Sequence, residues 1–412
     1  MKAPILIILL TCWCIIVNHK HNQSKTLWKG PFLYLNALMF LVFSNVAFFY
    51  LYPLYLQAIG SSAATIGWVM GLMPISTVAS RPFMGKWVAR RGEHRVIMTG
   101  LIIIFLSTLA YHGLQQVAWP MILVRIAHGI GLSAFVTAAV TAIARLIPPE
   151  RRGQAYSYTG AMVLAAVALM PLAGEQLIRG FGYPALFNSA AAVAFLAGIL
   201  TYMQLKGNRV QEVTGHGKHL FGPLLRRGSI WITLAAILLF VQGHATVLNF
   251  IALHADRIGL RSGSYFAAAA SIAFILRITL GFLIDRYGKK FFMKGSYIVF
   301  GLGIILIPFI SRSDIFYVSS LLYGIGLAFL FPSAIALAAD QARGAEELPA
   351  VMSLATGVFD LGFISGTVLS GWVADYFSLD ILFLSAGAMC FLGFVLMYFP
   401  VQESGASVRQ AQ

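Results

Sequence analysis

Charged residues are scarce in this 412-residue chain: Asp, Glu, Lys and Arg together make up 10% of it, against about a quarter in soluble domains. Hydrophobic residues make up 59% and the mean hydropathy is +0.82, which leaves too little polar surface to coat a globule in water. The only cysteines are Cys12, Cys14 and Cys390, and no His or Cys cluster at metal-ligand spacing accompanies them. The sequence therefore predicts no disulfide scaffold, no metal site and no cofactor.

Motifs for nucleotide hydrolysis and catalysis are also lacking. The chain contains no Gly-x-x-x-x-Gly-Lys-Ser/Thr run, which argues against an ATP-driven pump. It contains no His-Glu-x-x-His and no Gly-x-Ser-x-Gly, which argues against an enzyme. The apolar segments run for about twenty residues rather than alternating with polar ones, which excludes a membrane β-barrel and predicts an all-α membrane protein.

Twelve membrane-spanning helices are expected, with a segment before the first and a tail after the last. We predict an N-terminal leader or tail at 1–29, a six-helix half at 30–204, a linker on the cytoplasmic side at 205–229, a second six-helix half at 230–400 and a tail at 401–412. Residues 3–17 are apolar, but 15 residues are short for a membrane span. An interfacial leader, or a start codon assigned too far upstream, is therefore preferred to a thirteenth helix. The expected spans are 32–57, 63–83, 96–116, 119–144, 156–176, 184–204, 230–252, 265–284, 292–310, 315–339, 349–373 and 380–400.

The basic residues lie almost entirely on one side of these spans. Of the 29 Lys and Arg residues, 21 fall on the side that holds both termini, and 4 (Arg179, Arg257, Arg261 and Arg312) fall on the other. Because positive loops are retained in the cytoplasm, both termini are expected there, in a bacterial plasma (inner) membrane. The net charge of +15 thus reflects topology, and no nucleic-acid partner is expected.

The two halves repeat each other in sequence. The run from Arg81 to Gly92 matches the run from Arg277 to Gly288 at a shift of 196 residues. A Gly-Ile-Gly-Leu run in span four, at 129–132, returns in span ten at 324–327. Repeated halves related by an axis normal to the membrane are typical of one large class of transporters that work by alternating access.

Several motifs resemble those of the major facilitator superfamily over about residues 30–400. Gly281-x-x-x-Asp285-Arg286-x-Gly288-Lys289-Lys290 is similar to the family's signature loop, and its first-half copy has Ala89 in place of the acid. Arg125-x-x-x-Gly129 resembles a second family motif, and Pro171-x-x-Gly174 is a degenerate form of the antiporter motif. The Arg-Pro-Phe-x-Gly run at 81–85 resembles the arabinose-efflux-permease-like, drug–proton antiporter branch of bacterial exporters.

The resemblance implies a latch on the cytoplasmic side, built from glycines at close helix approaches and from ion pairs. Plain topological anchoring by the basic residues is the alternative. Glu346 and Glu347 are expected to pair with Arg90 and Arg91, and Asp285 with Arg151 or Arg152. The expected latch residues are Gly85, Arg90, Arg91, Gly92, Gly281, Asp285, Arg286, Gly288, Lys289, Glu346 and Glu347.

In the family, spans one, four, seven and ten line the substrate cavity. Polar side chains on these spans are therefore candidate substrate contacts, although hydrogen bonding between helices is the more ordinary role of each one. Their aromatic and amide character suits a mid-sized amphiphile better than a small anion. The candidates are Asn36, Asn45, His128, Gln242, His244, Asn249 and Tyr323.

Two charges lie deep inside expected spans and are candidates for proton coupling. Asp360 is the only acid near the middle of a span, where an unpaired carboxylate costs several kcal/mol to ionise. Its expected basic partners are Arg125, His128 or His244. A structural acid beside Gly357 and Gly362, and an Arg125 that bonds only to backbone carbonyls, are the alternatives. Glu175, Asp340 and Asp375 are expected at span ends, in water, and Arg81 and Arg277 are expected to snorkel or pack at a gate.

Together these features predict a proton-coupled exporter of a small organic molecule such as a drug, metabolite or siderophore. A proton-linked importer or facilitator of a nutrient or siderophore is the alternative in the same fold, and a receptor or scaffold that no longer transports is the alternative in another class. The expected partners are the lipid bilayer, a small-molecule substrate and protons, and the chain is expected to be a monomer.

Overall fold

The computed structural model of the protein describes residues 30–147, 152–204, 224, 226–281, 283–310, 313–343 and 347–401, without the side chains of 152–157, 285, 313 and 349. The expected leader, most of the linker and nearly all of the C-terminal tail lie outside these ranges. Within them, twelve helical segments are long and apolar enough to cross a membrane, which confirms the predicted all-α fold. No strand occurs in the described ranges.

The first half begins with α2 (Gly30–Phe48), which continues through a short 3-10 helix, η1 (Phe49–Leu51), into α3 (Tyr52–Ala58). It goes on with α4 (Ala63–Arg91), α5 (Glu93–Ala110), α6 (Trp119–Leu146), α7 (Arg152–Phe181) and α8 (Tyr183–Met203). The second half consists of α10 (Gly228–Arg257), α11 (Ser262–Leu280), the short α12 (Leu283–Tyr287), α13 (Lys289–Ile305), α14 (Ser313–Ala339), α15 (Leu348–Tyr376) and α16 (Leu379–Leu396).

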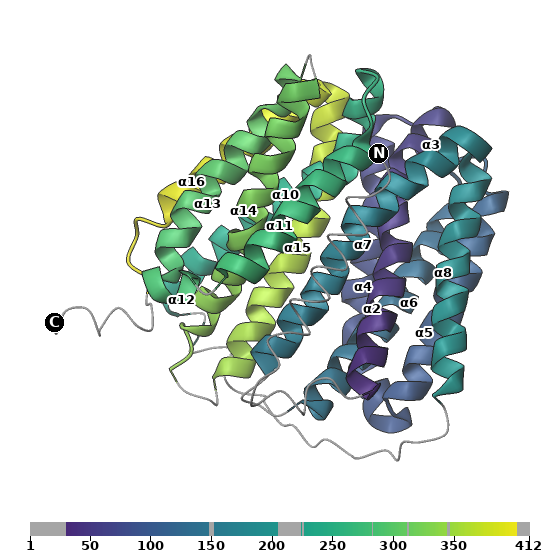
Figure 1. Ribbon diagram of the computed structural model, residues 1–412, viewed down its shortest axis with the longest axis horizontal. Helices are drawn as coiled ribbons and strands as arrows, with labels where there is room; N and C mark the ends of the chain where they lie inside the picture. The colour runs from purple at the N-terminus through teal and green to yellow at the C-terminus, as the bar shows by residue number, and fades with distance from the viewer. Residues whose placement is uncertain are drawn as a thin grey trace.

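The helices form two bundles that lie side by side, α2 to α8 on the right of Figure 1 and α10 to α16 on the left. The packing pattern repeats: α5 contacts α6 as α13 contacts α14, and α2 contacts α7 as α10 contacts α15. The bundles meet where α4 packs on α15 and α7 packs on α11. We call the end where α8 stops and α10 starts the linker end, and the opposite end the far end.

Glycines at repeated positions set these helix spacings. A Cβ on Gly129 of α6 would lie 2.3 Å from the carbonyl oxygen of Met73 in α4, and one on Gly324 of α14 would lie 2.4 Å from the carbonyl oxygen of Ala269 in α11. Such distances are shorter than any real Cβ contact, so both positions require glycine. The glycine run recognised as a sequence repeat therefore performs the same packing task in each half.

Chain reversals at the linker end also repeat. Gly92 follows α4 with a φ of 78°, and Gly288 follows α12 with a φ of 99°, a region that other residues rarely adopt. Behind each reversal an ion pair ties neighbouring helices: Glu93 to Arg145 at 2.6 Å in the first half, and Lys289 to Asp340 at 2.6 Å in the second. The signs of the charges are exchanged between the halves, so the pairing is kept while the residues differ.

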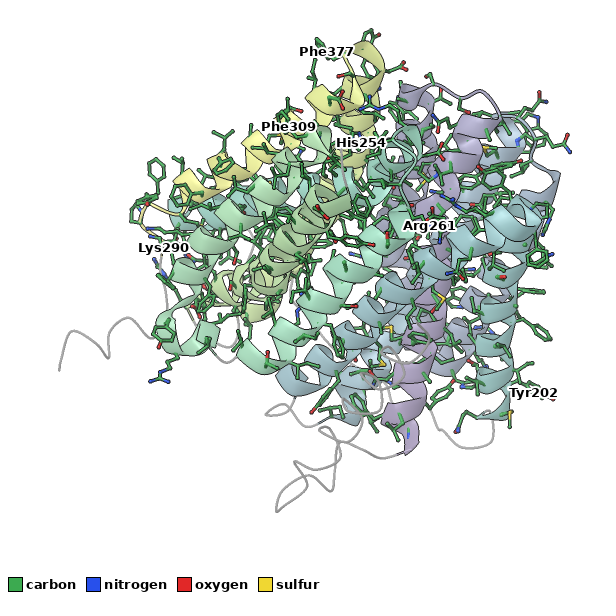
Figure 2. The ribbon with its side chains drawn as sticks, turned by 45° about the horizontal axis from the view of Figure 1, so that its top comes forward. Tyr202, His254, Arg261, Lys290, Phe309 and Phe377 are labelled. Atoms are coloured by element: carbon green, nitrogen blue, oxygen red, sulfur yellow. The ribbon has the colours of Figure 1, made fainter. Side chains whose placement is uncertain are left out.

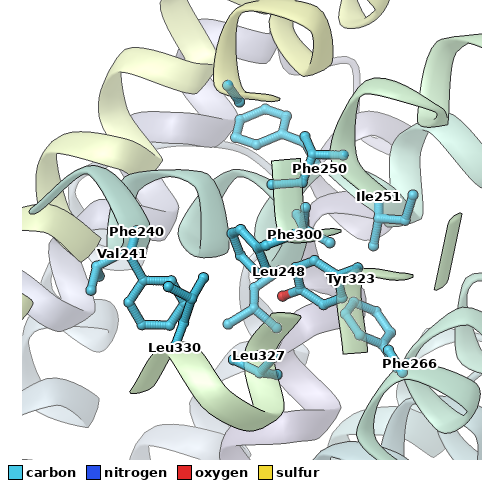
Figure 3. Close-up of a cluster of buried hydrophobic side chains, with 14 of the residues drawn as sticks. Phe240, Val241, Leu248, Phe250, Ile251, Phe266, Phe300, Tyr323, Leu327 and Leu330 are labelled. Carbon is cyan, nitrogen blue, oxygen red and sulfur yellow. The ribbon is translucent and has the colours of Figure 1, made fainter. Parts of the chain in front are cut away.

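The core is apolar in both bundles. Figure 3 shows part of it around Phe240, Phe300 and Tyr323, where α10, α13 and α14 meet. Large apolar side chains also cover the outside, including Trp119 (70% exposed) and Phe181 (78% exposed), and Phe309 and Phe377 project from the periphery in Figure 2. Apolar residues on both the inside and the outside are what a lipid-embedded bundle requires.

Candidate functional site

An ion pair between Arg81 of α4 and Asp360 of α15 joins the two halves. The Arg81 guanidinium contacts both carboxylate oxygens, with Nη2 donating to Oδ1 at 3.2 Å and Nη1 donating to Oδ2. Asp360 lies twelve residues, about 18 Å of helix, from the start of α15, and Arg81 lies about 15 Å from the linker-end terminus of α4. The side chains are 38% and 16% exposed, respectively, so a bidentate charge pair is held deep within the spanning region.

Asp360 therefore lies at the expected depth, but the predicted partners Arg125, His128 and His244 are wrong. Its partner is Arg81, which the sequence suggested would snorkel or pack at a gate. The sequence shows how deep each charge lies along its own helix, whereas the partner depends on how α4 crosses α15. Nothing local in the sequence specifies that crossing.

Arg125 of α6 is 1% exposed and bonds to backbone rather than to an acid. Its Nε donates to the Val69 carbonyl at 3.1 Å, and its Nη2 donates to the Met70 carbonyl at 3.2 Å. Its guanidinium lies 5.3 Å from the centroid of the Tyr52 ring. These contacts fasten α6 to α4 within the first half, which is the structural alternative that the sequence left open.

The polar candidates of the first half form a buried network. His128 Nε2 and Asn45 Oδ1 are 2.9 Å apart, and the Asn45 amide donates to Thr108 Oγ1 at 3.1 Å and to the Ala190 carbonyl at 2.8 Å. Asn45 and His128 have no exposed surface. Asn36 is 7% exposed and bonds to the Phe32 carbonyl of its own helix. In this conformation the network holds α2, α5, α6 and α8 together.

The polar candidates of the second half also pair within their own bundle. Gln242 donates to Ser365 Oγ at 2.9 Å, and Asn249 donates to Thr367 Oγ1 at 3.1 Å, so both connect α10 to α15. His244 Nδ1 lies 2.6 Å from the Tyr323 hydroxyl, with the two rings stacked. Gln242 and His244 retain partial exposure, whereas Asn249 and Tyr323 are buried. Substrate contact by these residues stays a prediction.

The expected first-half latch has a different form in this conformation. Gly85 lies inside α4, six residues before its end, and no described atom of a neighbouring helix lies within 4 Å of the position a Cβ would take. Arg90 and Arg91 are exposed in the last turn of α4. The close approach expected at Gly85 is therefore not present here.

Glu347 pairs with Arg227 of its own half, not with Arg90 or Arg91. Arg227 donates to Oε1 and Oε2 at 2.7 and 2.8 Å, and the Arg343 amide donates to Oε2 at 2.9 Å. These bonds hold the pKa of Glu347 at about 2 and raise the pKa of Arg227. Glu347 directly precedes α15, and its side chain reaches Arg227, which directly precedes α10 in the same bundle.

The second-half latch residues are only partly described. Lys289 pairs with Asp340 through both carboxylate oxygens, and Arg286 lies over the ring of Tyr287, 5.6 Å from its centroid. A Cβ on Gly281 would meet the Arg277 carbonyl of the preceding turn at 2.4 Å, not a neighbouring helix. The Asp285 side chain, Glu346, Arg151 and the Arg152 side chain lie outside the described part of the chain, as does the pairing predicted for Asp285.

At the far end, two equivalent contacts close the bundles on each other. Asp375 of α15 accepts a hydrogen bond from the first amide of α4, at Ala63 (3.2 Å), and Glu175 of α7 accepts one from Gly263 in the first turn of α11 (2.8 Å). The two acids are 200 residues apart in the sequence, and so are the two residues whose amides donate. A carboxylate at a helix N-terminus neutralises the positive end of the helix dipole, so each contact is stabilising.

Close backbone packing accompanies these hydrogen bonds. A Cβ on Gly67 would lie 2.8 Å from Gly371 Cα, and one on Gly263 would lie 2.6 Å from Leu172 Cα and 2.8 Å from the Pro171 carbonyl oxygen. We call this set the far-end contact: Ala63, Gly67, Pro171, Leu172, Glu175, Gly263, Gly371 and Asp375. In this set, backbone atoms of the two halves pack directly against each other at one end of the bundle.

Sequence reasoning missed the far-end contact and assigned Glu175 to water. Glu175 is 7% exposed because α11 covers it, so that expectation is wrong. One signal was present: Glu175 and Asp375 share a 200-residue spacing close to that of the motif repeat. Acids at equivalent span ends in both halves indicate that both make the same kind of contact. Acids that were merely solvated by water would not need to recur at equivalent positions.

Comparisons with known proteins agree with this architecture. The family model of the Major Facilitator Superfamily matches residues 33–294 and 262–411. Multidrug resistance protein 2 of Bacillus subtilis is 27% identical over 65% of this chain and 69% of its own length. The MFS-type transporter YhhS of Escherichia coli is 25% identical over 83% of this chain and 85% of its own length.

A solved structure shares the fold. The crystal structure of the nucleoside transporter NupG aligns with a TM-score of 0.72 and 17% identity, covering 90% of this chain and all of that chain. At that identity the likeness concerns the fold alone. The family match, the relatives and the repeated twelve-helix architecture lead to one conclusion: the chain belongs to the Major Facilitator Superfamily and is a multi-pass membrane transporter.

Proposed function

We propose that the protein is a proton-coupled secondary transporter that exports a small organic molecule, with Asp360 as its proton site. The observation that carries the proposal is the Arg81–Asp360 pair, because it joins α4 to α15 across the interface between the halves. Alternating access moves the halves relative to each other, so a charge pair across that interface is made and broken in each cycle.

The chemistry of the pair supplies the coupling. While Arg81 holds the carboxylate, Asp360 is stabilised in its ionised form. When the halves move and the pair separates, an ionised carboxyl at that depth loses its counter-charge, and binding a proton removes the cost. Re-forming the pair expels that proton. Each conformational cycle can therefore carry one proton from the side where the pair is open to the side where it re-forms.

The direction of transport is proposed from two observations. The excess of Lys and Arg at the linker end supports a cytoplasmic location for that end and both termini, and the far-end contact would then close the outer side. The likeness to a protein named Multidrug resistance protein 2 supports export. Labelling a Gly215→Cys variant in intact cells tests the orientation: protection from an impermeant thiol reagent is expected, and reaction from outside would reverse it.

Reconstitution into liposomes tests proton coupling. A panel of labelled drugs, metabolites and siderophores is offered with and without an imposed pH gradient, and a protonophore is added as the control. The proposal predicts that at least one compound accumulates against its gradient and that the protonophore abolishes accumulation while exchange of internal for external compound continues. Accumulation that ignores both the pH gradient and the protonophore would contradict the proposal.

A further inference from the structure

The crossing that carries the Arg81–Asp360 pair has an equivalent between α7 and α11, and there the acid is missing. Arg277 of α11 matches Arg81 at the motif shift of 196. The position matching Asp360, at the 200-residue shift that relates Glu175 to Asp375, is Gly160 of α7. The structure confirms the match, because a Cβ on Gly160 would lie 3.8 Å from Arg277 Nη1.

Arg277 has only neutral contacts among the described residues. Its Nη2 donates to the Leu327 carbonyl at 3.2 Å, and its guanidinium lies 5.7 Å from the centroid of the Phe331 ring. Its Nε is buried and makes no hydrogen bond within the described part of the chain. Arg277 is therefore a half-buried cation between the halves with donors to spare and no described counter-charge.

A guanidinium at membrane depth is costly unless an anion accompanies it, and Asp360 meets that requirement for Arg81. We propose that Arg277 binds the anionic group of the transported molecule, a carboxylate, sulfonate or phosphate ester on an organic body. Gly160 leaves the space that an acid side chain would fill, and the Phe331 ring beside the guanidinium suits an apolar body. The inference rests on the proposed transport function and names its substrate class.

Filling that space with an acid provides the sharpest test. A Gly160→Asp variant would give Arg277 an internal carboxylate, and Gly160→Asn is the matched control with the same shape and no charge. Among the described residues, no atom of another helix besides Arg277 Nη1 lies within 4 Å of the added Cβ, so the Cβ itself meets no clash there. The probes are naphthalene-1-acetate, naphthalene-1-sulfonate and 1-naphthyl phosphate, compared with neutral naphthalene-1-acetamide. Equilibrium binding is measured on purified protein in lipid nanodiscs without a pH gradient.

The unaltered protein is expected to bind at least one of the anions about tenfold or more tighter than the amide. Gly160→Asp and Arg277→Gln should each remove this preference, whereas Gly160→Asn should keep it. Absence of binding by all three anions, equal binding of anion and amide, or a preference that survives in Gly160→Asp would overturn the proposal. The assay needs no proton movement, so its outcome is separate from the fate of proton coupling at Asp360.

Discussion

Adding a single methyl group at Gly67 should force the far-end contact apart. The added Cβ would lie 2.8 Å from Gly371 Cα and 2.9 Å from the Thr367 carbonyl oxygen. Carbon atoms pack at about 3.5–4.0 Å, so α4 and α15 must separate by roughly 0.7–1.2 Å. Overpacking of this kind costs about 1–3 kcal/mol. Because the cost applies only while the far end is closed, the closed population should fall by about 5- to 150-fold relative to the open one.

Pulsed electron–electron double resonance measures the distance between spin labels at Gln57 and Arg261, which increases when the far end opens. Both residues are exposed at the far end, one in each half, and Arg261 is visible there in Figure 2. Gly67→Ala should transfer amplitude from the short to the long distance. Gly85→Ala is the matched control, because it adds the same methyl group to the same helix where no described atom of another helix lies within 4 Å. A Gly67→Ala distribution identical to that of the control would show that the added methyl group does not open the far end.

Three further predictions concern other contacts. The pKa of Glu347 is about 2, below its ordinary value of 4.5, so its contribution to stability is complete above about pH 4.5 and is lost as the pH falls toward 2. The unfolding temperatures at pH 7 and pH 3 should therefore differ less in Glu347→Gln than in the unaltered protein. Asn45→Leu should lower stability by about 1–3 kcal/mol by leaving His128 without its partner, and an unchanged unfolding temperature would contradict this. Glu175→Gln should favour the open far end by about two- to fivefold in the same distance measurement, since it removes about 0.3–1 kcal/mol of charge–dipole stabilisation.

Helices and their repetition could be predicted because they depend on local sequence. Runs of about twenty apolar residues indicate spans wherever they occur. Gly129 and Gly324 predict the same close helix packing in both halves, because a glycine repeated within a span allows a neighbouring helix to approach. The depth of Asp360 follows equally from counting along its helix. These inferences need no knowledge of which helices are neighbours.

Pairings between helices could not be predicted in the same way. Arg81, Arg125 and Arg277 are all arginines inside spans, yet one meets a carboxylate, one meets backbone carbonyls, and one faces Gly160. The difference arises from the crossing of α4 with α15 and of α7 with α11, which is set by packing over whole helices. Glu347 shows the same limit: it reaches Arg227 in its own bundle, a residue that lies outside the expected spans.

Gradient-driven accumulation by Asp360→Asn in proteoliposomes shows whether Asp360 carries the coupling proton. One pH unit supplies about 1.4 kcal/mol per proton, enough for about tenfold accumulation at one proton per molecule. Asp256→Asn, which alters an exposed acid at the far end, is the control. We expect Asp360→Asn to accumulate nothing above equilibrium while it still exchanges internal for external substrate, and we expect the control to match the unaltered protein. Full accumulation by Asp360→Asn would show that the proton travels by another route.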